Sequence, residues 1–431
     1  MRHTFTPIAA LLLAVALLLM GNGLLGTLIP VRGELEAFST ISIGLLGSTY
    51  FLGFAAGCIS ASYLVRRVGH IRTFTAMASI VAAVSLAHGL IAEPVPWWGM
   101  RAVTGFCFAV LYIVIESWLN ERATNETRGT ILSAYLIINL TVITLGQMMM
   151  TLSDPAGLTL FALASMLVSA AVVPVALSAA AAPQPIQSVH VRIPKLVRTS
   201  PIAFAACLGV GLANGAFWTL APLFVRGSGF DVTAVALFMS ATVLGGAAAQ
   251  WPLGRLSDVV DRGRVIVGMS ALSILLSALV ILSTNWSLNW VLAATAAWGA
   301  FAFPLYAVAV AQANDYAWPE EFVETSSGLL LIYAAGAIVG PMVATAFMDA
   351  FTANGLYGFI ASVHVVLVVF ACWQLKRPRP LADAAQVPFT DALQASQTVS
   401  STFDAEIQET LVHAEEEAHE HDPPEAEEPS S

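Results

Sequence analysis

Two stretches of the chain share one unusual pattern: NGLLGTLIP from Asn22 to Pro30, and NGAFWTLAP from Asn214 to Pro222. The second stretch lies 192 residues (214 − 22) after the first and keeps the asparagine, the first glycine, the threonine, a leucine and the proline. Both stretches lie inside long apolar runs, where polar or helix-disturbing residues are tolerated only if protein or water satisfies the backbone. The repeated exceptions indicate two structurally equivalent parts of one chain.

The composition is that of a membrane protein. The chain has 431 residues, of which 57% are hydrophobic and 11% charged, and its mean hydropathy is +0.77. Soluble domains carry about 25% charged residues, and about 20 consecutive apolar residues cross a bilayer as a helix. We therefore predict an all-α integral membrane protein in a lipid bilayer. The twelve predicted transmembrane helices are approximately 8–30, 41–64, 73–92, 96–119, 129–151, 158–182, 201–225, 232–253, 265–283, 287–312, 326–349 and 352–375.

The repeat extends along most of the apolar region. Further matches recur at an offset of 194 residues: Arg32-Gly33 with Arg226-Gly227, Gly69 with Gly263, Gly105 with Gly299, Tyr112 with Tyr306, and Asn120-Glu121 with Asn314-Asp315. We predict two six-helix halves in parallel orientation, 1–182 and 201–376, joined by a cytoplasmic linker, 183–200. From Leu381 onward the chain has 13 acidic residues and no lysine or arginine, so residues 377–431 are predicted to form a disordered acidic tail.

The basic residues predict the orientation. Nearly all of them fall on one side of the predicted helices: Arg2, Arg66, Arg67, Arg72, Arg122, Arg128, Arg192, Lys195, Arg198, Arg255, Arg262, Arg264, Lys376, Arg377 and Arg379. The other side receives Arg32 and Arg226. Because cytoplasmic loops carry the excess of lysine and arginine, we expect a multi-pass protein of the cytoplasmic (inner) membrane with both termini in the cytoplasm.

One loop resembles a family signature. GRLSDVVDRGR, residues 254–264, is similar to the Gly-x-x-x-Asp loop of the major facilitator superfamily, with Gly254 and Asp258 at the matching positions. Arg101-x-x-x-Gly105 resembles the arginine motif of the superfamily's fourth helix. The stretches ESWLNERATNETRG (116–129) and QANDYAWPEEFVETSSGLLLIY (312–333) resemble the YcaD-like group of this superfamily. The resemblance implies two six-helix bundles related by an axis along the membrane normal, a transporter and no fixed substrate; we expect a monomer.

The equivalent loop of the first half departs from the signature. In SYLVRRVGHIR, residues 62–72, Arg66 stands where the acid is usual, beside Arg67. We predict that one of these arginines pairs with Glu116 or Glu121 when the cytoplasmic side closes. A cluster that only follows the positive-inside rule is the alternative. The residues assigned to the gate and to coupling are Arg66, Arg67, Gly69, Glu116, Glu121, Gly254, Asp258, Arg262, Arg264, Asn314 and Asp315.

Polar and aromatic residues inside the predicted helices indicate a central cavity. Arg101, Phe108, Tyr112 and Glu116 share one face of the fourth helix, because at 100° per residue they fall within about 60° of one another. Arg101 would favour an anionic or polar group on a substrate; an interhelical hydrogen-bond centre is the alternative. The predicted cavity residues are Asn22, Arg101, Tyr112, Asn214, Trp218, Trp298, Tyr306 and Gln312. Asparagines that associate helices and aromatics that only pack or anchor are the alternatives.

These patterns favour a secondary active transporter that moves a small molecule by alternating access. Coupling to protons would use Glu116, the one carboxylate well inside a predicted span. A G-x-x-x-x-G-K-[ST] loop, H-E-x-x-H and G-x-S-x-G are absent from the sequence, so direct use of ATP and the common hydrolase chemistries are not indicated. We expect no enzyme, cofactor, metal or nucleic-acid partner. A non-transporting sensor that uses the acidic tail is the alternative.

Overall fold

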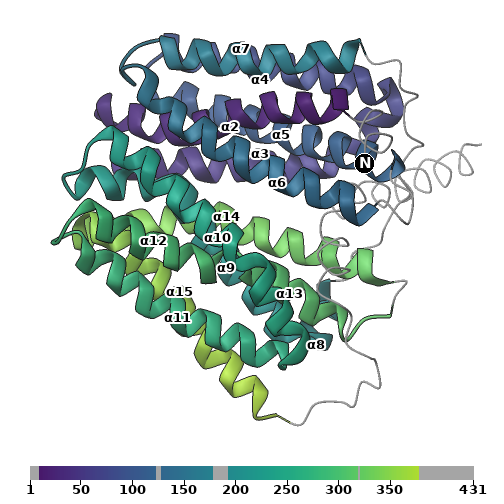
Figure 1. Ribbon diagram of the computed structural model, residues 1–431, viewed down its shortest axis with the longest axis vertical. Coiled ribbons are helices and arrows are strands. Elements are labelled where there is room, and N and C mark those ends of the chain that lie inside the picture. The colour runs from purple at the N-terminus through teal and green to yellow at the C-terminus, as the bar shows by residue number, and fades with distance from the viewer. Residues whose placement is uncertain (1–8, 123–127, 178–192, 319–320, 378–431) are drawn as a thin grey trace, which may run out of the picture.

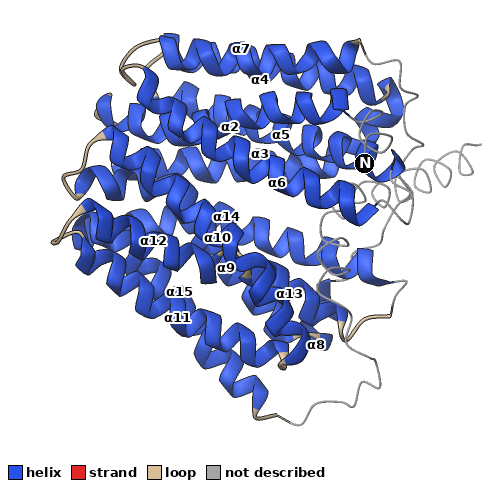
Figure 2. Cartoon of the chain, in the orientation of Figure 1, coloured by secondary structure: helices blue, strands red, loops and turns tan. Residues whose placement is uncertain are grey.

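The protein is a bundle of long helices (Figures 1 and 2). The computed structural model describes residues 9–122, 128–177, 193–318 and 321–377, and no strand occurs among them. The first half contains α2 (Ala9–Leu35), α3 (Thr40–Val68), α4 (His70–Leu90), α5 (Pro94–Arg122), α6 (Arg128–Met148), the 3-10 helix η2 (Met149–Leu152) and α7 (Thr159–Ala176). The second half contains α9 (Pro201–Gly227), α10 (Val232–Val259), α11 (Arg262–Ser283), α12 (Leu288–Ala302), α13 (Leu305–Asn314), α14 (Phe322–Phe351), the 3-10 helix η4 (Thr352–Asn354) and α15 (Gly355–Leu375).

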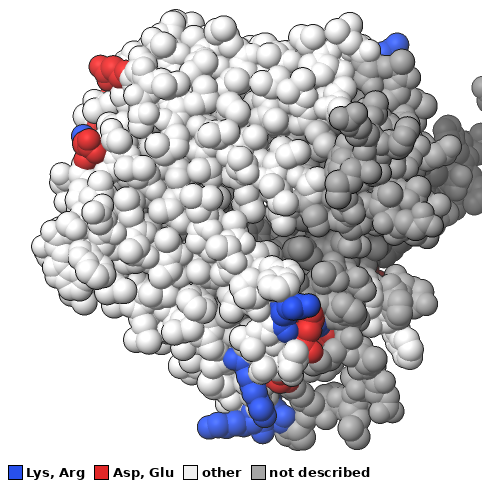
Figure 3. Space-filling view, viewed as in Figure 1, with Lys and Arg blue, Asp and Glu red and all other residues white. Residues whose placement is uncertain are grey.

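These helices make the predicted twelve crossings. The described residues form 11 apolar helical stretches long enough to span a membrane, and the last of them, Glu324–Leu375, contains both α14 and α15. The predicted tenth span, 287–312, is divided into α12 and α13. The division falls at Pro304, which has no backbone N–H to continue the helical hydrogen bonds. In Figure 3 the described charged side chains lie toward the two ends of the helices, with an uncharged band between them.

Glycine contacts show the internal repeat in three dimensions. A methyl group added to Gly23 of α2 would lie 2.5 Å from the carbonyl oxygen of Ile143 in α6. One added to Gly215 of α9 would lie 2.6 Å from the carbonyl oxygen of Ala337 in α14. Glycine therefore lets the two helix backbones touch in each half. These are the glycines that follow Asn22 and Asn214, so the contacts explain why the glycine of the motif occurs twice.

A second pair of contacts repeats in the same way. A methyl group on Gly53 of α3 would lie 1.9 Å from the carbonyl oxygen of Ala102 in α5. A methyl group on Gly245 of α10 would lie 2.0 Å from the carbonyl oxygen of Ala296 in α12. In both pairs the first helix repeats at an offset of 192 residues (215 − 23 and 245 − 53) and the second at 194 (337 − 143 and 296 − 102). The two halves thus share one packing scheme.

The structure corrects part of the predicted register. Helices α4 and α11 begin at His70 and Arg262, which are 192 residues apart (262 − 70). The predicted pairings of Arg32 with Arg226 and of Gly69 with Gly263 used 194 and are therefore wrong by two residues. The offset reaches 194 at α5 and α12, because α11 and the connection after it are each one residue longer than α4 and its connection. Position 66 corresponds to position 258 at the offset of 192.

The two halves share one apolar cluster at one end and have separate clusters at the other. We call the first the Arg226 end, because α9 finishes there; the cluster at this end contains Leu24 and Leu28 of the first half together with Phe217 of the second. At the opposite end, the Arg262 end, each half has its own cluster. Figure 1 shows the first-half helices above and the second-half helices below, with α8 near the Arg262 end.

Two predicted segments fall largely outside the described residues. The linker, 183–200, was expected to be a loop, but its final residues form a short helix, α8 (Ile193–Thr199). Residues 178–192 lie outside the described part of the chain, and so do residues 378–431, which hold nearly all of the predicted acidic tail.

Candidate functional site: a central cavity and its two ends

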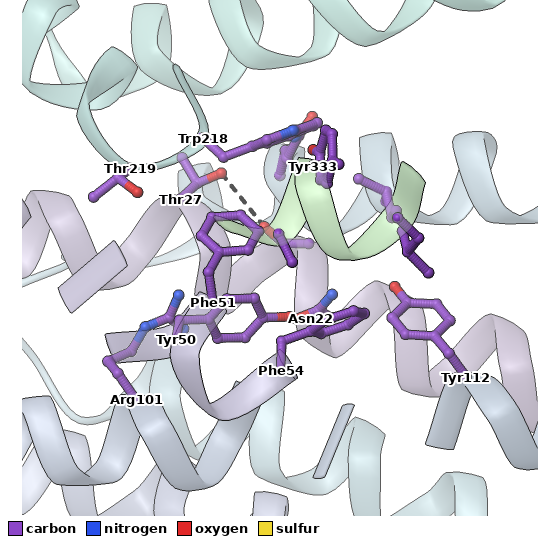
Figure 4. A pocket seen from close by; sticks show the side chains of 16 residues that line it. Asn22, Thr27, Tyr50, Phe51, Phe54, Arg101, Tyr112, Trp218, Thr219 and Tyr333 are labelled. Atoms are coloured by element: carbon purple, nitrogen blue, oxygen red, sulfur yellow. Dashed lines mark hydrogen bonds between the residues drawn. The ribbon is translucent and has the colours of Figure 1, made fainter. Parts of the chain in front are cut away.

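A cavity of about 320 Å³ lies between the two halves. Helices α2, α3, α5 and α6 line it from the first half, and α9 and α14 from the second (Figure 4). Its lining residues are Asn22, Gly23, Gly26, Thr27, Tyr50, Phe51, Phe54, Arg101, Tyr112, Ile143, Gln147, Trp218, Thr219, Leu330, Tyr333 and Ala334. A cavity at the interface of two repeats near the middle of the membrane is where transporters of this architecture hold their substrates.

Arg101 is the one charged side chain among these lining residues. Its Nε donates to the backbone carbonyl of Leu46 at 3.4 Å, and its guanidinium carbon lies 4.3 Å from the centre of the Tyr50 ring. The ion pairs found among the described residues lie at the two ends of the helices and do not include Arg101. The cavity therefore contains a cation that an aromatic ring supports and that no described carboxylate neutralises.

Aromatic rings cover much of the remaining wall. Tyr50, Phe51 and Phe54 come from α3, and Trp218 comes from α9 (Figure 4). The Trp218 indole is stacked on Phe303, with ring centres 5.6 Å apart and planes 19° apart. Packing of this kind holds the indole in place at the cavity wall.

The paired threonines of the opening motif are turned toward their own helices. Thr27 donates to the carbonyl of Gly23 at 3.4 Å, and Thr219 donates to the carbonyl of Gly215 at 2.8 Å. Four residues separate donor and acceptor in both cases. The two threonines thus repeat one local hydrogen bond, and their hydroxyl hydrogens are not available to a substrate in this conformation.

Four of the eight predicted cavity residues line the cavity: Asn22, Arg101, Tyr112 and Trp218. The other four, Asn214, Trp298, Tyr306 and Gln312, are not among its lining residues. Asn214 is buried beside Tyr333 of α14 and reaches the cavity only through it.

The other three predicted residues lie away from the cavity wall, each in different surroundings. Trp298 is fully buried in an aromatic cluster, with its ring 5.1 Å from Phe217 and 5.5 Å from Tyr357. Tyr306 packs edge-on against Tyr333, at 5.2 Å between ring centres. Gln312 is buried in α13 near the Arg262 end.

Phe108, predicted to share the cavity face of the fourth helix, is fully buried in the apolar cluster of the first half. Its neighbours Arg101 and Tyr112 on α5 do line the cavity. The α5 stripe therefore faces the cavity only in part.

A charge network closes the second half at the Arg262 end. Arg262 is almost completely buried; its Nη2 donates to Asp258 Oδ1 at 2.8 Å, and its Nη1 donates to the Ala311 carbonyl at 3.0 Å. The same Nη1 forms an ion pair with Asp315. The network joins the end of α10, the start of α11 and the end of α13. Nearby, Gly254 is buried, Asp261 caps α11 by accepting from the Arg264 amide at 3.0 Å, and Asn314 is fully buried.

The equivalent place in the first half has different chemistry. Arg66 and Arg67 are exposed, and Arg67 donates to the Tyr63 hydroxyl at 3.1 Å. Buried His70 lies with its Nε2 3.2 Å from the Ser117 hydroxyl oxygen. Gly69 is the single residue between α3 and α4, and its φ of 83° is a conformation that side chains rarely adopt.

Glu116 does not pair with the arginines of the first loop in this conformation. Its side chain is 8% exposed, and Oε2 has no hydrogen-bond partner among the described residues. It lies near the hydroxyls of Tyr112 and Tyr135. The side chain of Glu121 lies outside the described residues.

An ion pair that the sequence patterns did not reveal joins the halves at the Arg226 end. Arg226 Nε lies 3.4 Å from Glu34 Oε2, and both side chains are about one-third exposed or less. Close to this end the Ser240 hydroxyl of α10 donates to Gln147 Oε1 of α6 at 3.4 Å. Two polar contacts therefore bridge the halves at the end where they also share an apolar cluster.

Comparison with known families decides the class. The family model described as Major Facilitator Superfamily matches residues 11–333 and 229–401. The chain belongs to the major facilitator superfamily. The predicted resemblance to the YcaD-like group is confirmed as well. The proteins described as "Uncharacterized MFS-type transporter YcaD" are 27% identical in Escherichia fergusonii (365 residues; 84% of this chain, 94% of the relative) and 27% in Escherichia coli O17:K52:H18 (383 residues; 88% and 99%).

Solved major facilitator structures share the fold. The nucleoside transporter NupG superposes with a TM-score of 0.71 at 14% identity, over 88% of this chain and 100% of that one. An inward-facing, unoccupied bacterial homologue of the human lysosomal transporter Spinster superposes with a TM-score of 0.66 at 14% identity, over 93% and 98%. At this identity the likeness shows the fold and says nothing of the substrate.

Several cavity residues of this major facilitator protein were missed from the sequence, namely Tyr50, Phe51, Phe54 and Tyr333. Tyr50, Phe51 and Phe54 lie in α3, and aromatic residues are also common on helix faces that meet lipid or pack against protein. Tyr333 closes the stretch QANDYAWPEEFVETSSGLLLIY, which was quoted for its family resemblance and not for its chemistry. The repeat carried one usable signal: Tyr50 is equivalent to Thr242 (242 − 50 = 192), a polar residue at the same position of the second half.

Proposed function

We propose that this major facilitator protein is a secondary active transporter that moves a small organic molecule across the cytoplasmic membrane by alternating access. One observation carries the proposal. The central cavity lies between two repeat halves that share an apolar cluster and an ion pair at the Arg226 end, while each half keeps a separate cluster at the Arg262 end. Rocking of such halves about a central site is the motion that alternating access requires.

The positive-inside rule supports a sidedness for this arrangement. The loops at the Arg262 end carry Arg66, Arg67, Arg255 and Arg264, whereas the other end has Arg32 and Arg226. We therefore place the Arg262 end in the cytoplasm. The conformation described here is then inward-facing, and an even number of crossings puts both termini in the cytoplasm.

Membership in a transporter superfamily favours transport over a non-transporting sensor. The cavity also favours a substrate with an anionic or polar group, because Arg101 has no described carboxylate beside it. NupG is a nucleoside transporter, but its 14% identity carries only the fold.

We further propose that Glu116 carries the proton in a proton-coupled cycle. It is buried one helical turn from the cavity residue Tyr112, near Tyr135 of α6, with one oxygen unpartnered among the described residues. An ionised carboxylate in such surroundings is costly unless a cation accompanies it. We expect Glu116 to be protonated in this conformation and to release its proton when the cycle exposes it to water.

The predicted gate between the first-loop arginines and a carboxylate concerns the opposite state, in which the Arg262 end is closed. The repeat favours one pairing. Asp258 and Asp315 both contact Arg262, and the positions equivalent to these two aspartates are Arg66 and Glu121 (258 − 192 and 315 − 194). We therefore propose Arg66 with Glu121 as the pair that forms on closure.

Cysteine accessibility tests the proposal without a known substrate. Asn22→Cys, in a background without Cys58, Cys107, Cys207 and Cys372, is labelled by membrane-impermeant reagents from either side of oriented vesicles. Alternating access predicts labelling from both sides, at rates that change in opposite directions when the Arg226 end is weakened. Labelling from one side alone under every condition would contradict it.

The proton assignment has its own readout. Lowering the pH should favour the conformation that buries Glu116 and so speed labelling of Asn22→Cys from the Arg262 side. Glu116→Gln, which keeps the shape but cannot ionise, should remove this pH dependence. If the dependence persists in Glu116→Gln, another group carries the proton.

A further inference from the structure

The composition of the cavity wall defines a class of substrate. We propose that the site takes a small organic monoanion with a planar aromatic body, its carboxylate on Arg101 of the first half and its ring against Trp218 and Tyr333 of the second. The proposal rests on the transport function given above and goes beyond it by naming the chemistry of the cargo and its direction in the site.

The charge of the wall selects an anion. Arg101 is the single charged lining residue, and its guanidinium is held by the Leu46 carbonyl and the Tyr50 ring, neither of which carries a negative charge. In surroundings of low dielectric an unpaired charge interacts strongly with its counter-charge. A carboxylate accepts two parallel hydrogen bonds from a guanidinium, whereas a cationic substrate would add a second positive charge to the cavity.

Apart from the tyrosine hydroxyls, most other polar groups of the wall already have a partner. Thr27 and Thr219 donate to carbonyls of their own helices. Gln147 already accepts from Ser240, and Asn22 lies beside the Tyr112 hydroxyl. A sugar or another polyhydroxylated molecule needs several free partners to replace its water. This wall offers one strong polar anchor, which suits a molecule with one charged end and an apolar remainder.

The apolar remainder is best matched by a ring. Trp218 lines the cavity and is backed by the stacked ring of Phe303, and Tyr333 lies beside it in Figure 4. Rigid aromatic faces interact with planar ligands by offset or edge contacts, which add to the gain from burial. The cavity, at about 320 Å³, is at the small end of the range of about 300–1,000 Å³ for ligand sites. One ring or two fused rings with a carboxylate is the expected size.

The repeat shows that the anion site is present once. The positions equivalent to Tyr50 and Arg101 are Thr242 and Thr295 (offsets of 192 and 194), and these threonines are fully buried and hydrogen-bonded to each other at 2.7 Å. At the place where the first half has the cation Arg101, the second half therefore has a buried pair of uncharged threonines. One cation implies a substrate with one anionic group. The first half binds this group, and the second half contacts the aromatic ring of the substrate.

The halves also differ at the position of Trp218. Its equivalent is Gly26 (218 − 192), which lines the cavity and has nothing within 4 Å of the position of an added methyl group. The cavity wall thus has an indole from the second half and, at the equivalent position of the first half, open space beside a glycine. A planar molecule would fill this space and contact the indole.

The test uses purified full-length protein and a panel of matched probes. The carboxylates are benzoate, phenylacetate, indole-3-acetate and naphthalene-2-carboxylate; each is compared with its carboxamide, with benzylamine as the cation and cyclohexanecarboxylate as the non-aromatic anion. Affinity is measured by titration calorimetry and by the rise in melting temperature, since a ligand that binds the folded state stabilises it. We expect at least one aromatic carboxylate to bind about tenfold to a hundredfold more tightly than its carboxamide.

Three variants locate the effect. Arg101→Gln should abolish the preference for carboxylate over carboxamide, and Arg101→Lys should retain part of it, because lysine keeps the charge but not the two-pronged geometry. Gly26→Leu should weaken binding by filling the open space beside this glycine. Gly268→Leu is its matched control, since Gly268 also has nothing within 4 Å of an added methyl group but lies exposed on α11, away from the cavity.

Several outcomes would overturn the proposal: no carboxylate of the panel binds, carboxamides or benzylamine bind as tightly, cyclohexanecarboxylate matches the aromatic acids, or Arg101→Gln keeps the preference. The transport function is judged separately by two-sided labelling of Asn22→Cys without any probe. If labelling alternates and the carboxylates fail, the protein transports another class of molecule. If the carboxylates bind and labelling stays one-sided, the site binds anions without alternating access.

Discussion

The two halves of this transporter have one backbone plan and two different chemistries. Gly53 of the first half and Gly245 of the second each lie so close to a backbone carbonyl of the neighbouring helix that an added methyl group would clash with it. At the Arg262 end, however, the second half has a network of charges around the buried Arg262, and the first half buries His70 beside Ser117. In the cavity the asymmetry is reversed, since the first half contributes the cation. The comparison teaches that the repeats share their helix packing but not their charges. The buried cation lies at the helix ends in the second half and at the cavity wall in the first half.

The largest difference between the halves should appear when their equivalent buried polar residues are removed. Arg262→Met takes the shared cation from Asp258 and Asp315. Removal of one partner of a buried ion pair destabilises by up to about 3–5 kcal/mol, and the partial exposure of Asp258 reduces its share of that cost. His70→Ala removes one side-chain hydrogen bond, for which about 0.5–1.5 kcal/mol is expected besides lost packing. The check is the thermal unfolding midpoint of both variants in the same detergent.

The exposed Arg264→Met serves as control for the first of these changes, because its side chain lies on the same helix turn but outside the buried network. Equal losses from Arg262→Met and His70→Ala would mean that the charges add nothing beyond a hydrogen bond. The two halves would then be equivalent at this end as well.

Changes at the shared glycines should instead affect both halves alike. Gly53→Ala and Gly245→Ala place a methyl group about 2 Å from a backbone oxygen, and overpacking of this kind destabilises by about 1–3 kcal/mol. Gly268→Ala meets nothing within 4 Å and should be neutral or slightly stabilising, because alanine favours helix over glycine by about 0.5–1 kcal/mol. Detergent melting curves of the three variants test this, and a loss confined to one half would break the equivalence of the packing.

The twelve helices and their pairing in two halves could be predicted because they depend on length, composition and repetition. The cavity face could not be predicted to the same degree. Lipid tails are as apolar as the protein interior, so hydrophobicity does not separate lipid-facing from cavity-facing positions. Tyr50 on α3 was missed for this reason, while Trp298, fully buried among aromatic rings, was assigned to the cavity. Arg101 does line the cavity, and a charge inside a span has few other acceptable surroundings.

The ends of the helices were predictable only in part. Asp258 and Arg262 follow a family signature and do form an ion pair. The contact of Arg226 with Glu34 joins residues 192 positions apart (226 − 34) and depends on how two halves meet. The sequence around each residue does not encode how the two halves dock, so the pattern of charges predicts a side of the membrane but not the partner of Arg226.

The charge arrangement of the second half can be transplanted to sharpen the comparison. Arg66→Asp with His70→Arg gives the first half the residues that stand at 258 and 262. Each single change places one charge without its partner, whereas the double change restores a pair at i and i+4, as in the second half. We expect the double variant to be more stable than the sum of the single changes predicts, by about 0.5–3 kcal/mol for contacting residues. Additive melting shifts would show that the helix ends differ in more than their side chains.

The smallest expected effect concerns the contact between the halves at the Arg226 end. Glu34→Gln removes the charge that Arg226 meets, and a partly exposed ion pair contributes about 0–1 kcal/mol, so the balance of the two transport states should shift by at most about fivefold. Labelling of Asn22→Cys from the Arg226 side should rise by that factor and labelling from the other side should fall. Glu36→Gln is the matched control, because Glu36 pairs with Arg32 of its own helix at 2.6 Å and joins no second half. If both variants raise labelling equally, loss of negative charge at the surface accounts for the change. If neither does, the shared apolar cluster alone holds this end closed, and the ion pair is only a neighbour of that closure.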